Sequence, residues 1–170
     1  GKPQVQQALK YLVDYDQVAK TVLAGAYATQ QNYIPQGFLG AIKDQPFKLD
    51  VAKAKQLLAE AGYPNGFNIT MDVTNTFPWP EIAQAMQATF AQAGVKAELI
   101  PGDFRATLTK YRARNHDIYL GRWGADFLDP HSNADAFAKN VNNADDAPAK
   151  PLAWRNAWKN DELDRKSTRL

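Results

Sequence analysis

The sequence contains no cysteine, which removes disulfides, thiolate metal sites and cysteine nucleophiles from consideration. It also lacks an apolar run of about 18 residues, the length that a membrane-spanning helix needs. A secretory signal-peptide pattern is missing too, but the chain starts without Met and with a helix pattern already under way. We therefore expect a piece of a longer protein, in which the missing signal carries no information about location.

Neither sign of charge dominates the chain. Its 20 basic and 18 acidic residues are scattered and leave a net charge of +2. A nucleic-acid surface would show clustered Lys and Arg, so we expect no nucleic-acid partner. The apolar share of 45% and the charged share of 22% are those of an ordinary globular protein, and 170 residues can bury one core.

Several enzyme signatures are absent from the chain. No glycine-rich phosphate loop follows a predicted strand, and no serine stands in a Gly-x-Ser-x-Gly elbow. Asp126, Asp129, His131 and Asp135 lie close together in sequence, but their spacing matches neither a calcium loop nor a zinc site. We expect solvated loop carboxylates there, with no metal, no cofactor and no catalytic residue.

Hydrophobic periodicity predicts alternating helices and strands. The order strand, helix, strand, helix, strand is typical of right-handed crossover units, so we expect an α/β fold with a mainly parallel sheet flanked by helices. Asp14 or Asp16 is expected to cap the second helix, and Asp50 the third. The expected helices are 5–13, 17–23, 50–61, 81–93 and 103–114, and the expected strands are 67–73, 95–100 and 117–123.

The remaining segments are less regular. Residues 26–46 collect Gln, Asn, Pro and Gly, and a loop of this length is usually functional or mobile. A short helix is expected at 133–138 and a loop at 140–151. Trp154 and Trp158 are expected to pack in a core.

The stretch DIYLGRWGADFLDP, residues 117–130, reads as a strand that runs into a site. In open α/β sheets, ligands lie beyond the carboxyl ends of the strands, where Trp123 and Asp126 fall. Trp123 could face a ligand or pack in the core. Asp126 sits in a partly apolar loop and favours a cationic partner, either a ligand ammonium or Arg122, four residues earlier. The pattern leaves both alternatives open.

Four segments, in this order, resemble a known family. They are VQQALKYLVDYDQVAKTVLAG, DVAKAKQLLAEAGYPNGF, EIAQAMQATFAQAGVKAELI and RWGADFLDP. Together they are similar to the second lobe of the extracytoplasmic solute-binding proteins of dipeptide and oligopeptide ABC importers, family 5. The last segment matches that family's Trp-x-Ala-Asp-Tyr/Phe motif with its trailing Asp-Pro.

The resemblance implies a fold and a function. Residues 1–170 would form a single α/β lobe of the type II periplasmic-binding-protein fold, and the first lobe would be absent from this chain. Asp126 would anchor a peptide ammonium, with Trp123 and Gly124 as cleft contacts and with Arg122 and Asp129 as accessory candidates. The full-length receptor would be periplasmic or otherwise extracytoplasmic and would deliver its ligand to a membrane ABC permease. The exposed lobe face would invite self-association.

Other functions remain open at this point. The same receptor family could bind another solute, such as an oligosaccharide, an opine or a nickel chelate, because a fold does not fix a function. The alternatives from other classes are a small protein-interaction domain and a small α/β enzyme whose site has no recognisable sequence motif.

Overall fold

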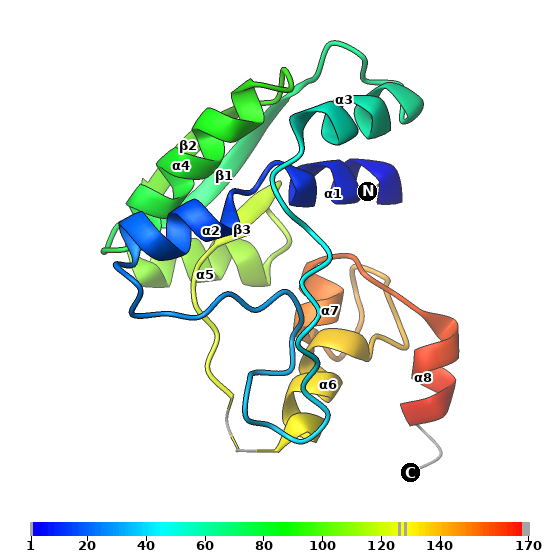
Figure 1. Ribbon diagram of the computed structural model, residues 1–170. Helices are drawn as coiled ribbons and strands as arrows, with labels where there is room; N and C mark the ends of the chain where they lie inside the picture. The colour runs from blue at the N-terminus through cyan, green and yellow to red at the C-terminus, as the bar shows by residue number, and fades with distance from the viewer. Residues whose placement is uncertain (1, 126, 128, 168–170) are drawn as a thin grey trace. The chain divides into compact units, whose positions relative to one another are not determined.

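The computed structural model describes residues 2–125, 127 and 129–167. Contacts between Cα atoms divide the chain into two compact units (Figure 1). The first unit holds the described residues of Gly1–Thr29, Gln45–Thr109 and His116–Gly121. The second holds those of Gln30–Asp44, Lys110–Asn115 and Arg122–Leu170.

The first unit is built on a parallel sheet. Its strands are β1 (Asn68–Thr74), β2 (Lys96–Gly102) and β3 (Ile118–Leu120), in the order β2-β1-β3. Both neighbours of β1 run parallel to it, with Met71 opposite Leu99 and Ile118. The predicted parallel α/β arrangement is therefore confirmed.

Helices flank this sheet. Helix α4 (Trp79–Ala91) packs against β1 and β2 (Figure 1), and Thr107 of α5 (Phe104–Arg112) places its hydroxyl 3.4 Å from that of Thr74. Helices α1 (Pro3–Tyr11) and α3 (Val51–Glu60) pack against each other. Apolar side chains that these helices bury include Ala8 of α1, Leu58 of α3 and Phe90 of α4.

Side-chain caps set where the helices begin. Asp50 accepts a hydrogen bond from the Lys53 backbone N–H at 2.8 Å, as predicted for α3. Asp14 rather than Asp16 caps α2 (Tyr15–Gln17). The expected helix at 17–23 is divided: α2 is one short turn, and a π-helix, η1 (Val18–Val22), follows it.

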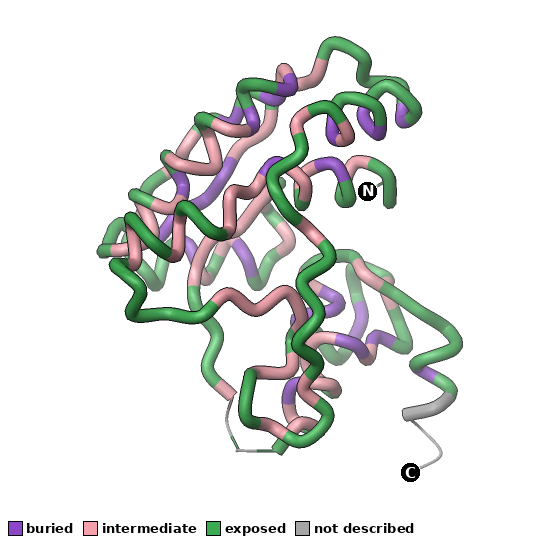
Figure 2. Tube along the Cα trace, viewed as in Figure 1, coloured by how far each residue is buried: buried purple, intermediate pink, exposed green. Residues whose placement is uncertain are grey.

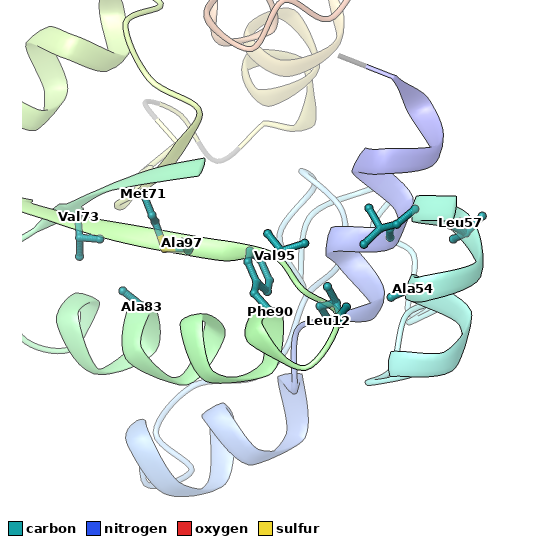
Figure 3. Close-up of a cluster of buried hydrophobic side chains, with 12 residues drawn as sticks. Leu12, Ala54, Leu57, Met71, Val73, Ala83, Phe90, Val95 and Ala97 are labelled. Atoms are coloured by element: carbon teal, nitrogen blue, oxygen red, sulfur yellow. The ribbon is translucent and has the colours of Figure 1, made fainter. Parts of the chain in front are cut away.

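The core of the first unit lies between helices and strands (Figures 2 and 3). Phe90 of α4 and Val95, which precedes β2, are almost fully buried together with Leu12 at the end of α1. Residues 71–74 of β1, the central strand of the sheet, are all buried. A central strand of a parallel sheet is covered on both faces.

Other boundaries also differ from the sequence prediction. Strand β3 covers three residues rather than 117–123, since the chain leaves its pairing with β1 after Leu120. Helix α4 begins at Trp79, because Pro80 suits the first turn of a helix. Helix α6 (Pro130–Ala138) begins three residues before the expected 133–138 for the same reason.

The second unit contains an irregular segment, Gln30–Asp44, and three helices among its described residues. They are α6, α7 (Leu152–Arg155) and α8 (Asp161–Ser167). Trp154 is 2% exposed, which confirms its predicted core position, whereas Trp158 is only half-buried. The Arg114 guanidinium lies 3.8 Å from the centre of the Trp154 ring and donates to the Trp154 and Asn143 carbonyl oxygens.

No helix in the described part of the chain combines the length and the apolar character that membrane crossing requires.

Two glycines make a close backbone contact before β1 and β2. Gly66 has a φ of +75°, and a Cβ at this position would overlap the Gly94 carbonyl oxygen. Gly25 has nearly the same φ, +74°, but no described atom lies within 4 Å of its Cβ position. Comparing Gly66 with Gly25 therefore separates the cost of steric overlap from the cost of a left-handed backbone.

We predict that Gly66→Ala lowers the free energy of unfolding by more than about 2 kcal/mol, because the turn before β2 must move. Gly25→Ala should cost only about 1 kcal/mol, for the left-handed backbone alone. Urea unfolding of both variants measures the difference. Equal costs would show that the two turns do not pack as described.

Candidate functional site

The candidate site begins where β3 ends. Leu120 pairs with Val73 of β1, and a Cβ at Gly121 would overlap the Tyr119 hydroxyl. The chain leaves the sheet at this glycine, and residues from Arg122 onward belong to the second unit. A parallel strand therefore leads by its carboxyl end into the candidate segment, as the sequence predicts.

Trp123 is held by α6 and remains partly open. Its indole Nε1–H donates to Asn133 Oδ1 at 3.2 Å, and its ring meets the Phe137 ring edge-on, with centroids 5.6 Å apart and planes at 83°. The residue is nevertheless 42% exposed. The indole is thus held by α6 and remains partly exposed to solvent.

Three residues that sequence reasoning missed complete this cluster. Asn133 is 1% exposed, and its Nδ2 donates to the Tyr33 carbonyl oxygen at 2.7 Å. The Tyr33 ring stacks on Phe137 with centroids 6.0 Å apart. The signals available in the sequence were the spacing of Asn133 and Phe137, one helical turn apart, and an aromatic residue within a polar loop.

The neighbours of Trp123 are open to solvent. A Cβ at Gly124 would meet no described atom within 4 Å, so the backbone there is accessible. Arg122 is exposed. Asp126 lies outside the described residues, and the choice between Arg122 and a ligand as its partner stays open.

Asp129 has a structural role. Its carboxylate accepts a hydrogen bond from the His131 backbone N–H at 2.6 Å and caps α6, with Pro130 in the first turn. Asp135, further along this helix, pairs with Lys139 at 3.2 Å. No group of three or more His, Asp or Glu side chains that could hold a metal occurs in residues 2–125, 127 and 129–167.

A cavity of about 270 Å³ lies elsewhere in the second unit. It is formed by the end of α6 and the following loop, and neither Trp123 nor Gly124 is among its lining residues. The lining is Asp135, Lys139, Asn140, Val141, Asn142, Pro148, Ala149, Lys150 and Pro151. The cavity lining contains none of the residues predicted to bind a ligand, which are Arg122, Trp123, Gly124, Asp126 and Asp129.

Comparison with known proteins identifies relatives. A family model described as bacterial extracellular solute-binding proteins, family 5 Middle, matches residues 1–145. The chain is 33% identical over 132 residues to the dipeptide-binding protein of Escherichia coli, a match that covers 74% of this chain and 25% of that protein. It is 35% identical over 102 residues to the glutathione-binding protein GsiB of Pectobacterium atrosepticum, covering 59% and 20%.

Among solved structures, the chain is similar to the ABC transporter-associated periplasmic binding protein DppA from Helicobacter pylori in complex with peptide STSA. The TM-score is 0.86 at 27% sequence identity, and the match covers 99% of this chain and 33% of that one. This chain therefore spans between a fifth and a third of the length of these relatives.

Asp129 can stabilise α6 through its hydrogen bond as a helix cap or through its negative charge, and two substitutions separate these effects. We predict that Asp129→Ala lowers the free energy of unfolding by about 1 kcal/mol, because the first turn of α6 loses its acceptor. Asp129→Asn should retain most of the stability, since an amide oxygen also caps. Urea unfolding measures both variants. If Asn were as costly as Ala, the negative charge rather than the cap would be the stabilising feature.

Proposed function

The chain belongs to family 5 of the bacterial extracellular solute-binding proteins, and from this premise we propose that it is the ligand-binding second lobe of an ABC-importer receptor for peptides. The observation that carries this proposal is the Trp123 indole, which is fixed by Asn133 and Phe137 yet 42% exposed. The named ligands of the relatives, a dipeptide and a tetrapeptide complex among them, support peptides as the solute. Membership of a family of binding proteins favours binding over catalysis.

Asp126 is the proposed anchor of the ligand. An ammonium and a carboxylate that are both partly removed from water form a charge-assisted hydrogen bond, which is stronger than a neutral one. Gly124 supports the proposal because its open backbone allows a ligand to approach. The peptide side chains would then lie against the exposed indole or in hydrated space, where bridging water tolerates different side chains.

Arg122 and Asp129 are the accessory residues of this proposal. Arg122 is exposed next to Trp123 and could meet the ligand carboxylate or pair with Asp126. Asp129 acts mainly by starting α6, the helix that holds Trp123 in place. Its contribution to binding would therefore be indirect.

The proposal also implies a first lobe, a location and a transport partner for the receptor. One lobe, residues 1–170, would close on the ligand together with a first lobe from elsewhere in the protein, consistent with the chain's 25% share of the dipeptide-binding protein. The receptor would act outside the cytoplasm and deliver its ligand to a membrane ABC permease. Exposed apolar side chains such as Leu39, at 85%, would favour self-association of an isolated lobe.

A receptor for a different solute is the second candidate, because the relatives are named for different ligands. Calorimetry on the full-length protein that contains this chain separates the two. We expect heat of binding with a pool of di- and tripeptides and none with a pool of oligosaccharides. The reverse result would overturn the peptide proposal.

For the ligand anchor, we predict that Asp126→Asn in the full-length protein weakens peptide binding by roughly 2 to 5 kcal/mol, as expected when one partner of a buried charge pair is lost. The melting temperature of the ligand-free protein should change little. Asp135→Asn is the matched control, because Asp135 is an exposed carboxylate of the same unit that pairs with Lys139. Unchanged affinity with a lower melting temperature would identify Arg122 as the partner of Asp126.

A further inference from the structure

We propose that Asn133 is the positioning residue of Trp123, and that it makes the segment Gln30–Asp44 part of the same ligand-facing wall. The proposal rests on the proposed function, since it takes the exposed side of Trp123 as the ligand contact. The juxtaposition itself is independent of any ligand. It joins three parts of the second unit: the loop after β3, the irregular segment and α6.

Both the oxygen and the nitrogen of the Asn133 side-chain amide form hydrogen bonds. Its oxygen accepts the Trp123 indole N–H at 3.2 Å, and its nitrogen donates to the Tyr33 carbonyl oxygen at 2.7 Å. Since the side chain is 1% exposed, water does not replace a lost partner cheaply. A side-chain amide offers an acceptor and a donor on one planar unit. Asn133 therefore fixes the loop and the irregular segment against α6 at once.

Phe137 repeats this connection through aromatic packing. It lies one helical turn after Asn133 and contacts the same two residues, Trp123 edge-on and Tyr33 nearly face to face, at an interplanar angle of 20°. Polar and apolar contacts thus join the same pair of segments. A displacement of the indole must move Phe137 and, through it, the Tyr33 ring.

The irregular segment is braced from within. Gln30 Nε2 donates to the Ile34 carbonyl oxygen at 2.8 Å, and Asn32 uses its amide for the Ile42 carbonyl oxygen at 3.2 Å and the Ile34 N–H at 3.0 Å. Because these bonds close the segment on itself, we expect a change at Tyr33 to affect the rest of the segment. Tyr33 is itself 41% exposed, so its ring can share a ligand contact with Trp123.

The first test follows the Trp123 resonance in the ligand-free, full-length protein labelled with 5-fluorotryptophan and assigned with Trp123→Phe. Asn133→Leu should shift and broaden the Trp123 signal and speed exchange of its indole N–H by tenfold or more, as expected for a lost buried bond. An unchanged Trp123 signal would overturn the proposal.

Asn140→Leu is the matched control. Asn140 is 2% exposed, and its amide donates to Asn143 Oδ1 and the Trp158 carbonyl oxygen in the same unit. This variant should disturb the Trp158 signal and leave that of Trp123 in place. If it moved Trp123 as much as Asn133→Leu does, general loosening of the unit rather than positioning would be the cause.

The second test removes the indole donor and keeps an aromatic ring. Trp123→Phe should speed backbone amide exchange across 30–44 severalfold, measured by mass spectrometry, because Asn133 loses one of its two partners. Unchanged exchange there would overturn the coupling. This variant decides the question if Asn133→Leu does not fold.

Peptide titration separates the two proposals. If the wild type binds the di- and tripeptide pool, Asn133→Leu should weaken binding at least tenfold, which corresponds to about 1.4 kcal/mol. The affinity of Asn140→Leu should stay within about threefold of the wild type. A wild type that binds no peptide would end the proposed function, while the ligand-free resonance and exchange results would still decide the role of Asn133.

Discussion

One buried side-chain amide, that of Asn133, holds the candidate site together. It is nearly inaccessible to water and has partners on two other segments, the indole of Trp123 and the backbone of Tyr33. A buried amide that loses a partner carries a desolvation cost of about 1 to 3 kcal/mol, so this arrangement resists small displacements. A recognition surface built on a loop gains from such bracing, because a preordered indole loses less conformational entropy when a ligand binds.

The candidate segment directly follows a strand of the parallel sheet along the chain. Strand β3 pairs with β1 over three residues, and its carboxyl end leads directly into Arg122 and Trp123. Parallel strands bring their carboxyl ends to one edge, which is where ligands are bound in open α/β sheets. Asp129 and Pro130 then start α6, which supplies both side chains that hold the indole. The Asp-Pro pair therefore starts the helix that contacts the indole.

Much of the fold could be predicted from local patterns. Asp50 and the apolar face of 51–61 specify α3 through a cap and a periodicity that neighbours along the chain determine. The short length of β3 could not be predicted, because it depends on where pairing with β1 ends. The role of Asn133 was also hidden. Its partner Tyr33 lies 100 residues away in sequence, and no local pattern encodes such a contact.

We propose that the segment after β3 forms one wall of a peptide-binding cleft. A crystal structure of the full-length protein with a bound peptide tests it most directly. We expect the peptide's amino nitrogen about 3 Å from the Asp126 carboxylate, with the peptide lying against the exposed part of Trp123. A peptide amine bound elsewhere, with Asp126 paired to Arg122 instead, would contradict it.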